Sequence, residues 1–87
     1  MKIIFESKVE KKLIKIGHRN RRLLEKINEA IVLFKKEPKY PSLRLHKIRG
    51  KKNDVWSISV EADLRIIFIY IKDGILLIDI GSHDEVY

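Results

Sequence analysis

The chain has 87 residues, of which 45% are hydrophobic, so its composition predicts one globular domain over residues 1–87 and excludes a disordered chain. It contains no cysteine, which excludes disulfides, thiolate nucleophiles and cysteine-based zinc sites. No apolar run approaches the roughly 18 residues of a membrane span, and the N-terminus does not read as a signal peptide, so we expect a cytoplasmic protein without a membrane partner.

Positive charge is concentrated in the first part of the chain, although the net charge is only +7. Residues 1–52 hold 17 Lys and Arg against 5 Asp and Glu, whereas residues 53–87 hold 2 against 7. This uneven distribution favours a polyanion such as RNA, or an acidic protein, as the partner. A well-solvated basic surface is the alternative on charge alone.

The N-terminal segment predicts a short strand followed by a helix. The strand covers residues 2–5. Ser7 and Glu10 have the spacing of a capping box, in which each side chain satisfies an unpaired N–H of the first turn. The helix is therefore expected over about residues 8–16, and Gly17 is expected to end it because glycine adopts the left-handed conformation readily.

A second helix is the clearest element of the sequence. Its apolar residues recur at helical spacing, and they are Leu23, Leu24, Ile27, Ala30, Ile31 and Phe34. Pro38 ends the pattern, since proline lacks the N–H that a helix needs. Two consecutive helices with one apolar stripe each need a surface to cover, and this predicts a sheet beside them.

The rest of the chain shows a period of two, which is typical of strands. The expected strands are residues 43–48, 55–60, 64–71 and 75–80. In the second of these, Trp56 shares one face with Ile58 and Val60, which favours a core position over base stacking, while two serines occupy the other face. Asp73-Gly74 predicts a hairpin turn before the last strand, and Gly81 closes that strand.

The expected fold class is α+β, with the element order β-α-α-β-β-β-β. Short connections between the strands imply a mostly antiparallel sheet. Both N-terminal helices are expected on one face of this sheet, because each must bury its apolar stripe.

Histidines are the residues best suited to proton transfer near neutral pH. His18 is expected at the surface. His46 lies on the polar side of its predicted strand, and His83 follows the last strand. A lone histidine is more often structural, but two at the edge of one polar face make catalysis an equal alternative. Because the adjacent residues 83–85 rarely converge on one ion, no metal and no cofactor is expected.

A basic surface with few titratable groups suits the cleavage of RNA. RNA supplies its own nucleophile, the 2′-hydroxyl next to the scissile phosphate. The protein must align this oxygen with the leaving 5′-oxygen, accept one proton and donate another. A cationic side chain must also stabilise the charge of the phosphorane.

Four stretches of the second half carry a specific resemblance. They are residues 45–50 (Leu-His-Lys-Ile-Arg-Gly), 55–60 (Val-Trp-Ser-Ile-Ser-Val), 63–68 (Asp-Leu-Arg-Ile-Ile-Phe) and 77–87, which ends in Gly-Ser-His-Asp-Glu-Val-Tyr. Together they resemble the RelE/YafQ-type mRNA interferases, toxins of the RelE/ParE superfamily. The preceding helix pair is similar in layout, so the resemblance covers nearly the whole chain and implies a RelE-like fold.

The resemblance also implies catalytic roles. His46 occupies the place of a histidine that takes part in proton transfer, and His83 that of a general acid or base. Tyr87 matches an aromatic residue that positions the substrate base. Asp63 matches an acidic residue in the turn between the central strands, and Arg65 resembles a basic residue that stabilises the transition state.

One position departs from the family pattern. YafQ-like toxins carry a further histidine where this chain has Ser59, and serine cannot perform that proton transfer at neutral pH. Either the two histidines suffice, or Lys47 contributes, or the activity is weak. Arg65 has a structural alternative as well, as the ion-pair partner of Asp63 or Asp79.

Partners follow from the same resemblance. It implies a toxin of a type II toxin–antitoxin module, a metal-independent endoribonuclease that acts on ribosome-bound mRNA and forms a hetero-oligomer with a cognate antitoxin. The residues expected to bind RNA are Arg44, Lys47, Arg49, Lys51 and Lys52. Two alternatives remain: a ParE-like toxin that acts on DNA gyrase and cleaves nothing, and an inactive module that only binds its antitoxin.

Overall fold

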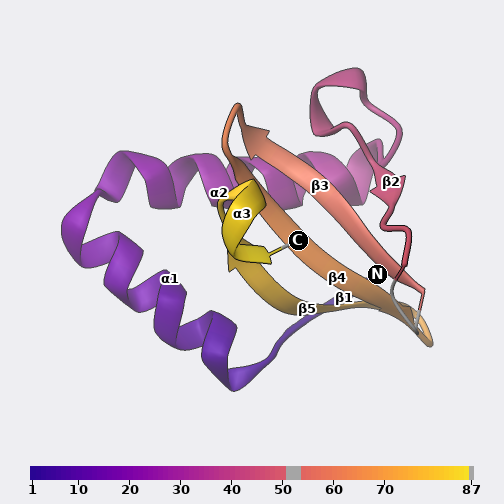
Figure 1. The fold of residues 1–87 in the computed structure, drawn as a ribbon, viewed down its shortest axis with the longest axis horizontal. Coiled ribbons are helices and arrows are strands. Elements are labelled where there is room, and N and C mark those ends of the chain that lie inside the picture. Colours follow the sequence, from indigo (N-terminus) through magenta and orange to yellow (C-terminus); the bar gives the residue numbers. More distant parts are fainter. Residues whose placement is uncertain (51–53, 87) are drawn as a thin grey trace.

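A computed structural model describes residues 1–50 and 54–86 of the chain. Nine elements follow one another along it (Figure 1): β1 (Lys2–Phe5), α1 (Ser7–Arg19), α2 (Arg21–Lys36), the 3-10 turn η1 (Pro41–Leu43), β2 (His46–Lys47), β3 (Val55–Glu61), β4 (Leu64–Ile71), β5 (Gly74–Gly81) and α3 (His83–Val86). Within the described part, none of the helices has the length and apolar character needed to cross a membrane.

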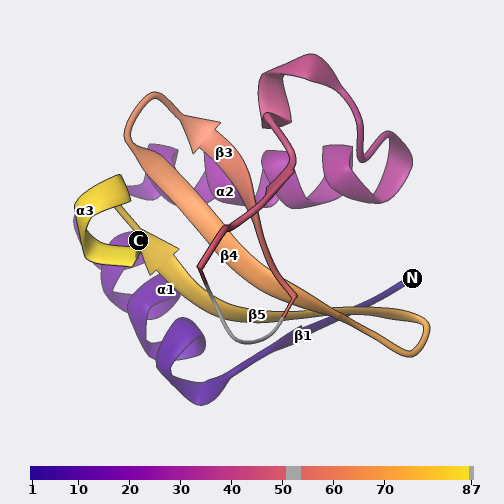
Figure 2. The same ribbon diagram turned by 45° about the vertical axis from the view of Figure 1, so that its right-hand side comes forward.

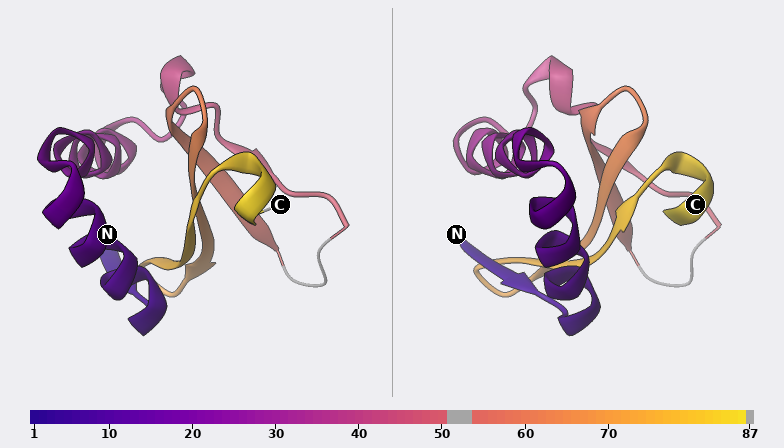
Figure 3. Two further views of the ribbon diagram at one scale, coloured as in Figure 1. Left: turned by 60° about the vertical axis from the view of Figure 1, so that its left-hand side comes forward. Right: turned by 90° about the vertical axis from the view of Figure 1, so that its left-hand side faces the viewer.

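The strands form one sheet in the order β1-β5-β4-β3-β2. Every neighbouring pair is antiparallel except β1 and β5, which run parallel from Lys2 opposite Gly74 to Phe5 opposite Leu77. Helices α1 and α2 lie on one side of the sheet and α3 lies on the other (Figures 2 and 3). The expected α+β class, with both N-terminal helices on one face of a mostly antiparallel sheet, is confirmed.

The hydrophobic core lies between the sheet and the two long helices. Ile27 and Phe34 of α2 are fully buried, as are Ile66 and Phe68 of β4. The rings of Phe34 and Phe68 meet edge to face, with their centroids 5.2 Å apart. Trp56 is half-buried and packs against this core, as its parity predicts. The sheet surface toward α1 and α2 is called the core face below, and the opposite surface the α3 face.

Helix α1 is longer than expected, and both predicted end signals are wrong. Glu6 is the N-cap residue and no side chain caps the helix there, so Ser7 and Glu10 form no capping box. Gly17 does not end the helix, which continues to Arg19. A β-carbon at position 17 would lie 2.9 Å from the Leu24 side chain of α2. This glycine allows α1 and α2 to approach each other closely, and the chain turns at Asn20, whose side chain caps α2.

The first strand after the helices is also shorter than expected. Leu43 belongs to the 3-10 turn and is buried, and Arg44 adopts the left-handed conformation with φ 48°. A residue in that conformation cannot continue a strand, so β2 contains two residues only. The β4–β5 turn lies one residue earlier than expected, with Asp73 at φ 65° and Gly74 already in β5.

A bulge changes the alternation of β5. The register shifts between Ile67 and Phe68, so that Phe68 pairs with Leu77 while Ile67 pairs with Asp79. Leu77 and Ile80 both point into the core although they lie three residues apart. The bulge therefore turns Asp79 away from the core, where strict alternation would have buried it beside Leu77.

Candidate functional site

Strand register brings the predicted catalytic residues to one face. His46 of β2 pairs with Ser57 of β3, which pairs with Ile67 of β4. In the adjacent row, Arg65 of β4 pairs with Ser59 and with Gly81. Since paired residues of neighbouring strands share a face, His46 and Arg65 both lie on the α3 face.

The elements that carry the two histidines lie apart along the sheet. His46 is on the edge strand β2, whereas His83 begins α3, which follows β5. Three strand spacings separate β2 from β5, or about 14 Å. Helix α3 lies on this face and contacts β4 as well as β5. In the order of the sheet, β4 with Arg65 lies between β2, which carries His46, and β5, which leads into His83.

His46 is oriented by the backbone of Arg44. Its Nδ1 lies 2.9 Å from the Arg44 carbonyl oxygen. A carbonyl oxygen only accepts hydrogen bonds, so in this contact Nδ1 carries the proton and Nε2 of the neutral ring carries the lone pair. This tautomer can accept a proton at Nε2. The His46 side chain is exposed, which allows a substrate to reach it.

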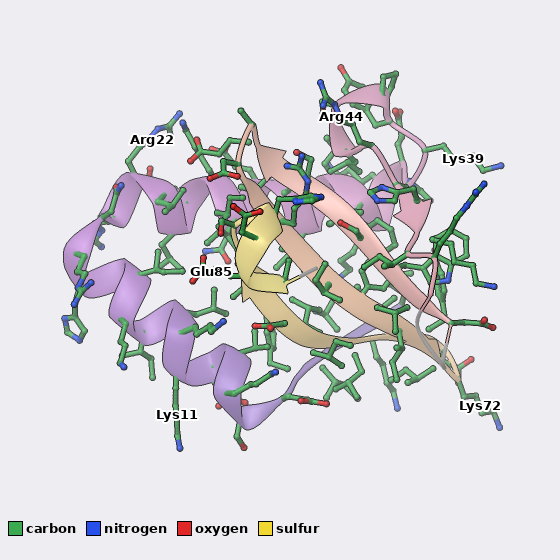
Figure 4. The ribbon with its side chains drawn as sticks, viewed as in Figure 1. Lys11, Arg22, Lys39, Arg44, Lys72 and Glu85 are labelled. Atoms are coloured by element: carbon green, nitrogen blue, oxygen red, sulfur yellow. The ribbon has the colours of Figure 1, made fainter. Side chains whose placement is uncertain are left out.

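Helix α3 presents His83 through a capping box that the sequence prediction missed. The Glu85 carboxylate accepts a hydrogen bond from the Ser82 N–H at 2.8 Å, and the Ser82 hydroxyl accepts one from the Glu85 N–H at 3.3 Å. The Ser82 backbone N–H, and then its side chain, hold the pKa of the Glu85 carboxyl below its usual value. Figure 4 shows Glu85 on α3, in front of the sheet. His83 itself is exposed, and its Nδ1 lies 3.7 Å from Asp84 Oδ1.

Arg65 holds the β3–β4 turn together. Its Nη1 donates to Ser59 Oγ at 3.0 Å and to the carbonyl oxygens of Glu61 and Ala62 at 3.0 and 3.2 Å. The structural alternative for Arg65 is therefore correct in kind but wrong in its partner, because neither Asp63 nor Asp79 pairs with it in the described part of the chain. Ser59 is buried and its hydroxyl oxygen accepts a hydrogen bond from this guanidinium.

The remaining predicted residues are dispersed. Asp63 lies exposed in the β3–β4 turn and forms no ion pair with any described residue. Lys47 forms an ion pair with Asp54 at 2.9 Å, and Arg49 is exposed in the turn after β2. Lys51, Lys52 and Tyr87 lie outside the described residues.

An apolar groove of about 430 Å³ lies on the α3 face. Its walls are Val55, Ile67, Ile69, Ile78 and Val86, and its rim carries Glu6, Lys8 and Asp79. This surface was not predicted from the sequence. The apolar character of β4 on both faces was the only signal for it, and that signal does not distinguish a groove from a covered face.

Charged residues of α1 and β5 meet at the rim of the groove. Lys12 Nζ donates to Asp79 Oδ1 at 2.7 Å and to the Ile80 carbonyl oxygen at 2.9 Å, and Lys8 Nζ lies 3.6 Å from Asp79 Oδ2. Burial raises the pKa of the Asp79 carboxyl, but the hydrogen bonds from Lys12 and the Ile80 N–H outweigh it, so the net pKa is lowered. Asp79 is therefore ionised at neutral pH and fixes β5 to α1 just before the segment that carries His83.

Metal ligands do not gather in this site. Among residues 1–50 and 54–86, no group of three or more His, Asp or Glu side chains is arranged to hold an ion. The polar residues on this side of the sheet include His46, whose Nδ1 contacts the Arg44 carbonyl, the exposed His83 and Arg65. This set can accept a proton, donate a proton and bind an anion.

Comparison with known proteins rests on the fold. No protein-family model and no curated protein matches the sequence. The YoeB/ParE toxin from Agrobacterium tumefaciens matches with a TM-score of 0.80 at 21% identity, over 95% of this chain and 99% of that chain. A metal-bound toxin from Helicobacter pylori matches with a TM-score of 0.80 at 22% identity, over 100% and 99%. The E. coli DinJ–YafQ toxin–antitoxin complex contains a chain that matches with a TM-score of 0.79 at 16% identity, over 99% and 96%.

These likenesses extend over nearly the full length of both chains in every case, at identities of 16 to 22%. The expected resemblance to RelE/YafQ-type proteins is thereby confirmed at the level of the fold. The chain has the fold of the YoeB/ParE and YafQ toxins.

Proposed function

We propose that this protein is the toxin of a type II toxin–antitoxin module and an endoribonuclease that cleaves ribosome-bound mRNA without a metal ion. The observation that carries the proposal is that strand register puts His46 and Arg65 on the α3 face, and that His83 begins the helix on this face. The fold, shared with proteins that are themselves toxins, supports it. Because the substrate is mRNA, the proposed place of action is the cytoplasm.

The proposed reaction uses the 2′-hydroxyl of the substrate as nucleophile. A histidine accepts the 2′-proton while the 2′-oxygen attacks phosphorus, and the bond from phosphorus to the 5′-oxygen breaks. The other histidine donates a proton to that leaving oxygen. The products are a 2′,3′-cyclic phosphate and a 5′-hydroxyl. We assign the base to His46, because its Nδ1 is held by the Arg44 carbonyl and its Nε2 carries the lone pair, and the acid to His83.

Arg65 is proposed to stabilise the phosphorane. Only Nη1 of its guanidinium is engaged by the β3–β4 turn, and the guanidinium fork has further donors that can reach a phosphate. The three acceptors around Nη1 fix the orientation of the group, and such preorganisation is what makes electrostatic stabilisation effective. On this proposal Ser59 does not replace the missing family histidine in proton transfer but positions the arginine.

An antitoxin is the proposed protein partner. The similar YafQ and YoeB structures were solved as complexes named for a toxin and its antitoxin. We propose that a cognate antitoxin of this chain folds onto its basic surface and forms a hetero-oligomer, as disordered acidic segments do on binding. Co-expression with the product of the adjoining gene should give a complex that survives gel filtration, and separate elution of the two proteins at micromolar concentration would contradict this proposal.

Induced expression in a bacterial host tests the nuclease. Wild type is compared with His83→Ala and with His18→Ala, a matched control because His18 is an exposed histidine on α1. Primer extension on a reporter mRNA should show discrete cuts for wild type and His18→Ala, and at least about a hundredfold fewer for His83→Ala, the usual loss on removing a general acid or base.

Other outcomes of this experiment would overturn the proposal. Growth arrest with intact mRNA in all three strains would indicate a ParE-like action on gyrase, for which His46 and His83 are not required. Absence of arrest for the wild type would indicate an inactive antitoxin-binding module. Cuts that persist unchanged in His83→Ala would leave the nuclease but remove His83 from its mechanism.

A further inference from the structure

A second groove lies at the β2 edge of the sheet, on the side away from α3. Its volume is about 350 Å³ and it is lined by Lys39, Tyr40, Pro41, Arg44, Leu45 and Trp56; it is called the edge groove below. This volume lies within the range of roughly 300–1,000 Å³ that is common for small-ligand sites. The groove is separate from the apolar groove on the α3 face.

Two aromatic side chains, Tyr40 and Trp56, line the edge groove. Tyr70 of β4 stands against Trp56 edge to face, with the ring centroids 5.5 Å apart. Tyr40 and Tyr70 are exposed, at 45% and 47% of their surface. Single-stranded nucleic acids bind through such rings, because every base has a flat face that stacks on them.

Two cationic side chains line the groove. Lys39 and Arg44 line it and form no ion pair with any described residue, and both side chains extend outward from the loop between α2 and β2 (Figure 4). Lys47 lies across from Trp56 on the same face, paired with Asp54. A cation without a protein counter-charge is available to a phosphate, and phosphate contacts supply most of the sequence-independent affinity for nucleic acids.

The backbone connects the groove to the candidate catalytic site. Arg44 has φ 48°, a conformation that glycine or asparagine adopts far more easily than arginine. Its carbonyl oxygen accepts the hydrogen bond from His46 Nδ1, while its side chain lines the groove. His46 and Lys47 are consecutive strand residues, so they point to opposite faces. An RNA strand at His46 reaches the edge groove by passing around β2.

We propose that the edge groove binds one or two bases of single-stranded RNA beside the scissile phosphate, with a base stacked on Tyr40 and phosphates held by Lys39 and Arg44. The inference rests on the proposed nuclease function and adds a second substrate subsite to it. An acidic peptide would use the same two cations but would not need the aromatic rings, and this difference makes the two ligands separable.

The test measures binding of a 2′-O-methyl RNA oligonucleotide, which lacks a free 2′-hydroxyl and cannot be cleaved, by fluorescence anisotropy at low salt. Tyr40→Leu keeps apolar surface but removes the flat ring, and it should weaken binding about fivefold or more. Tyr40→Phe should stay within about twofold of wild type. Among the described residues Tyr40 takes part in no aromatic pair, so Tyr40→Leu leaves the core packing intact.

Two further variants test the charges. Arg44→Gly preserves the left-handed backbone and removes the guanidinium, so it should weaken binding and lower the slope of log affinity against log salt by about one. Lys11→Ala is the matched control, because Lys11 is an exposed cation on α1 (Figure 4), and it should change neither quantity.

The outcomes separate this inference from the proposed function. Two results would overturn the RNA subsite. One is an unchanged RNA affinity in Tyr40→Leu. The other is a poly-glutamate peptide that displaces the RNA equally well from wild type and from Tyr40→Leu. If the matching unmodified RNA is cut while Tyr40→Leu binds normally, only the subsite fails. If binding depends on Tyr40 but the unmodified RNA is never cut, the subsite stands and the nuclease fails.

Discussion

Replacing Asp79 is expected to destabilise the protein, because this carboxylate fixes β5 to α1. It accepts a hydrogen bond from Lys12 Nζ at 2.7 Å and one from the Ile80 N–H at 2.8 Å. In Asp79→Ala, Lys12 keeps only its bond to the Ile80 carbonyl oxygen at 2.9 Å.

The expected cost follows from the burial of the pair. The side chain of Asp79 is 21% exposed and that of Lys12 is 39% exposed, so the pair lies between a surface ion pair, worth about 0–1 kcal/mol, and a well-shielded charged hydrogen bond, worth about 1.5–3 kcal/mol. We expect Asp79→Ala to lower the free energy of unfolding by about 2 kcal/mol. Lys12→Met keeps the aliphatic stem and should cost about 1 kcal/mol.

Urea denaturation followed by circular dichroism gives these values, and a double-mutant cycle isolates the pair. The coupling between Lys12 and Asp79 should be about 1 kcal/mol at pH 7. Asp84→Ala serves as control, since Asp84 is fully exposed, and should cost less than about 0.5 kcal/mol. A coupling indistinguishable from zero at pH 7 would refute the claim that this pair fixes β5 to α1.

The same pair predicts a pH dependence. The pKa of Asp79 is lowered in the folded state from its usual 3.8, so its stabilising contribution is complete above that value and is lost as the pH falls through the folded pKa. The difference in stability between wild type and Asp79→Ala should therefore be constant from pH 7 to pH 5 and shrink below pH 3.8. A difference that grew on acidification would contradict the assigned sign.

Three further predictions can be tested on the purified protein. Gly74→Ala should cost about 3 kcal/mol or more in thermal unfolding, because a β-carbon there would overlap the Lys2 carbonyl; a cost below about 1 kcal/mol would mean that β1 is not held against β5. The Glu85 carboxylate caps α3 and its pKa is lowered from 4.5 by this contact, so the protection factor of the Val86 N–H against hydrogen exchange should fall as the pH drops through the folded pKa and should be low at every pH in Glu85→Ala. RNA cleavage should continue in EDTA, and its loss there with recovery on adding a divalent metal would exclude the metal-independent mechanism.

Helix ends illustrate which part of the fold sequence patterns can predict. The same four-residue spacing occurs at Ser7–Glu10 and at Ser82–Glu85, but only the second forms a capping box. At the first, the N-cap position falls one residue earlier, at Glu6. The spacing is local information, whereas the residue at which a helix starts depends on how the preceding strand docks onto β5.

The strands show a similar limit. Period-two alternation located β3, β4 and β5 correctly, since each has a buried face along its whole length. It failed at Leu43, which is buried by the 3-10 turn rather than by a strand, and it gave no sign of the bulge that turns Asp79 out of the core. Alternation reports which residues are buried and says nothing about an inserted residue.

The candidate site was only partly accessible from the sequence. His46 and His83 could be selected by type and position; the register puts His46 on the α3 face, and His83 begins the helix on that face. The contact of Arg65 with Ser59 joins a directly paired position of β3 and β4, but it needed the register of the hairpin, which the sequence pattern did not fix. The two grooves depend on surfaces from separate elements, for which no local pattern exists.

The parallel pairing of β1 with β5 has a consequence for how the protein is made. Lys2 pairs with Gly74, so β1 cannot meet its partner until 72 further residues have been synthesised. Contacts of such wide sequence separation slow folding, because a long loop must close before they form. During synthesis the helix pair can form while Ile3 and Phe5 still lack the strand beside which they lie, and unpaired strands of this kind favour aggregation.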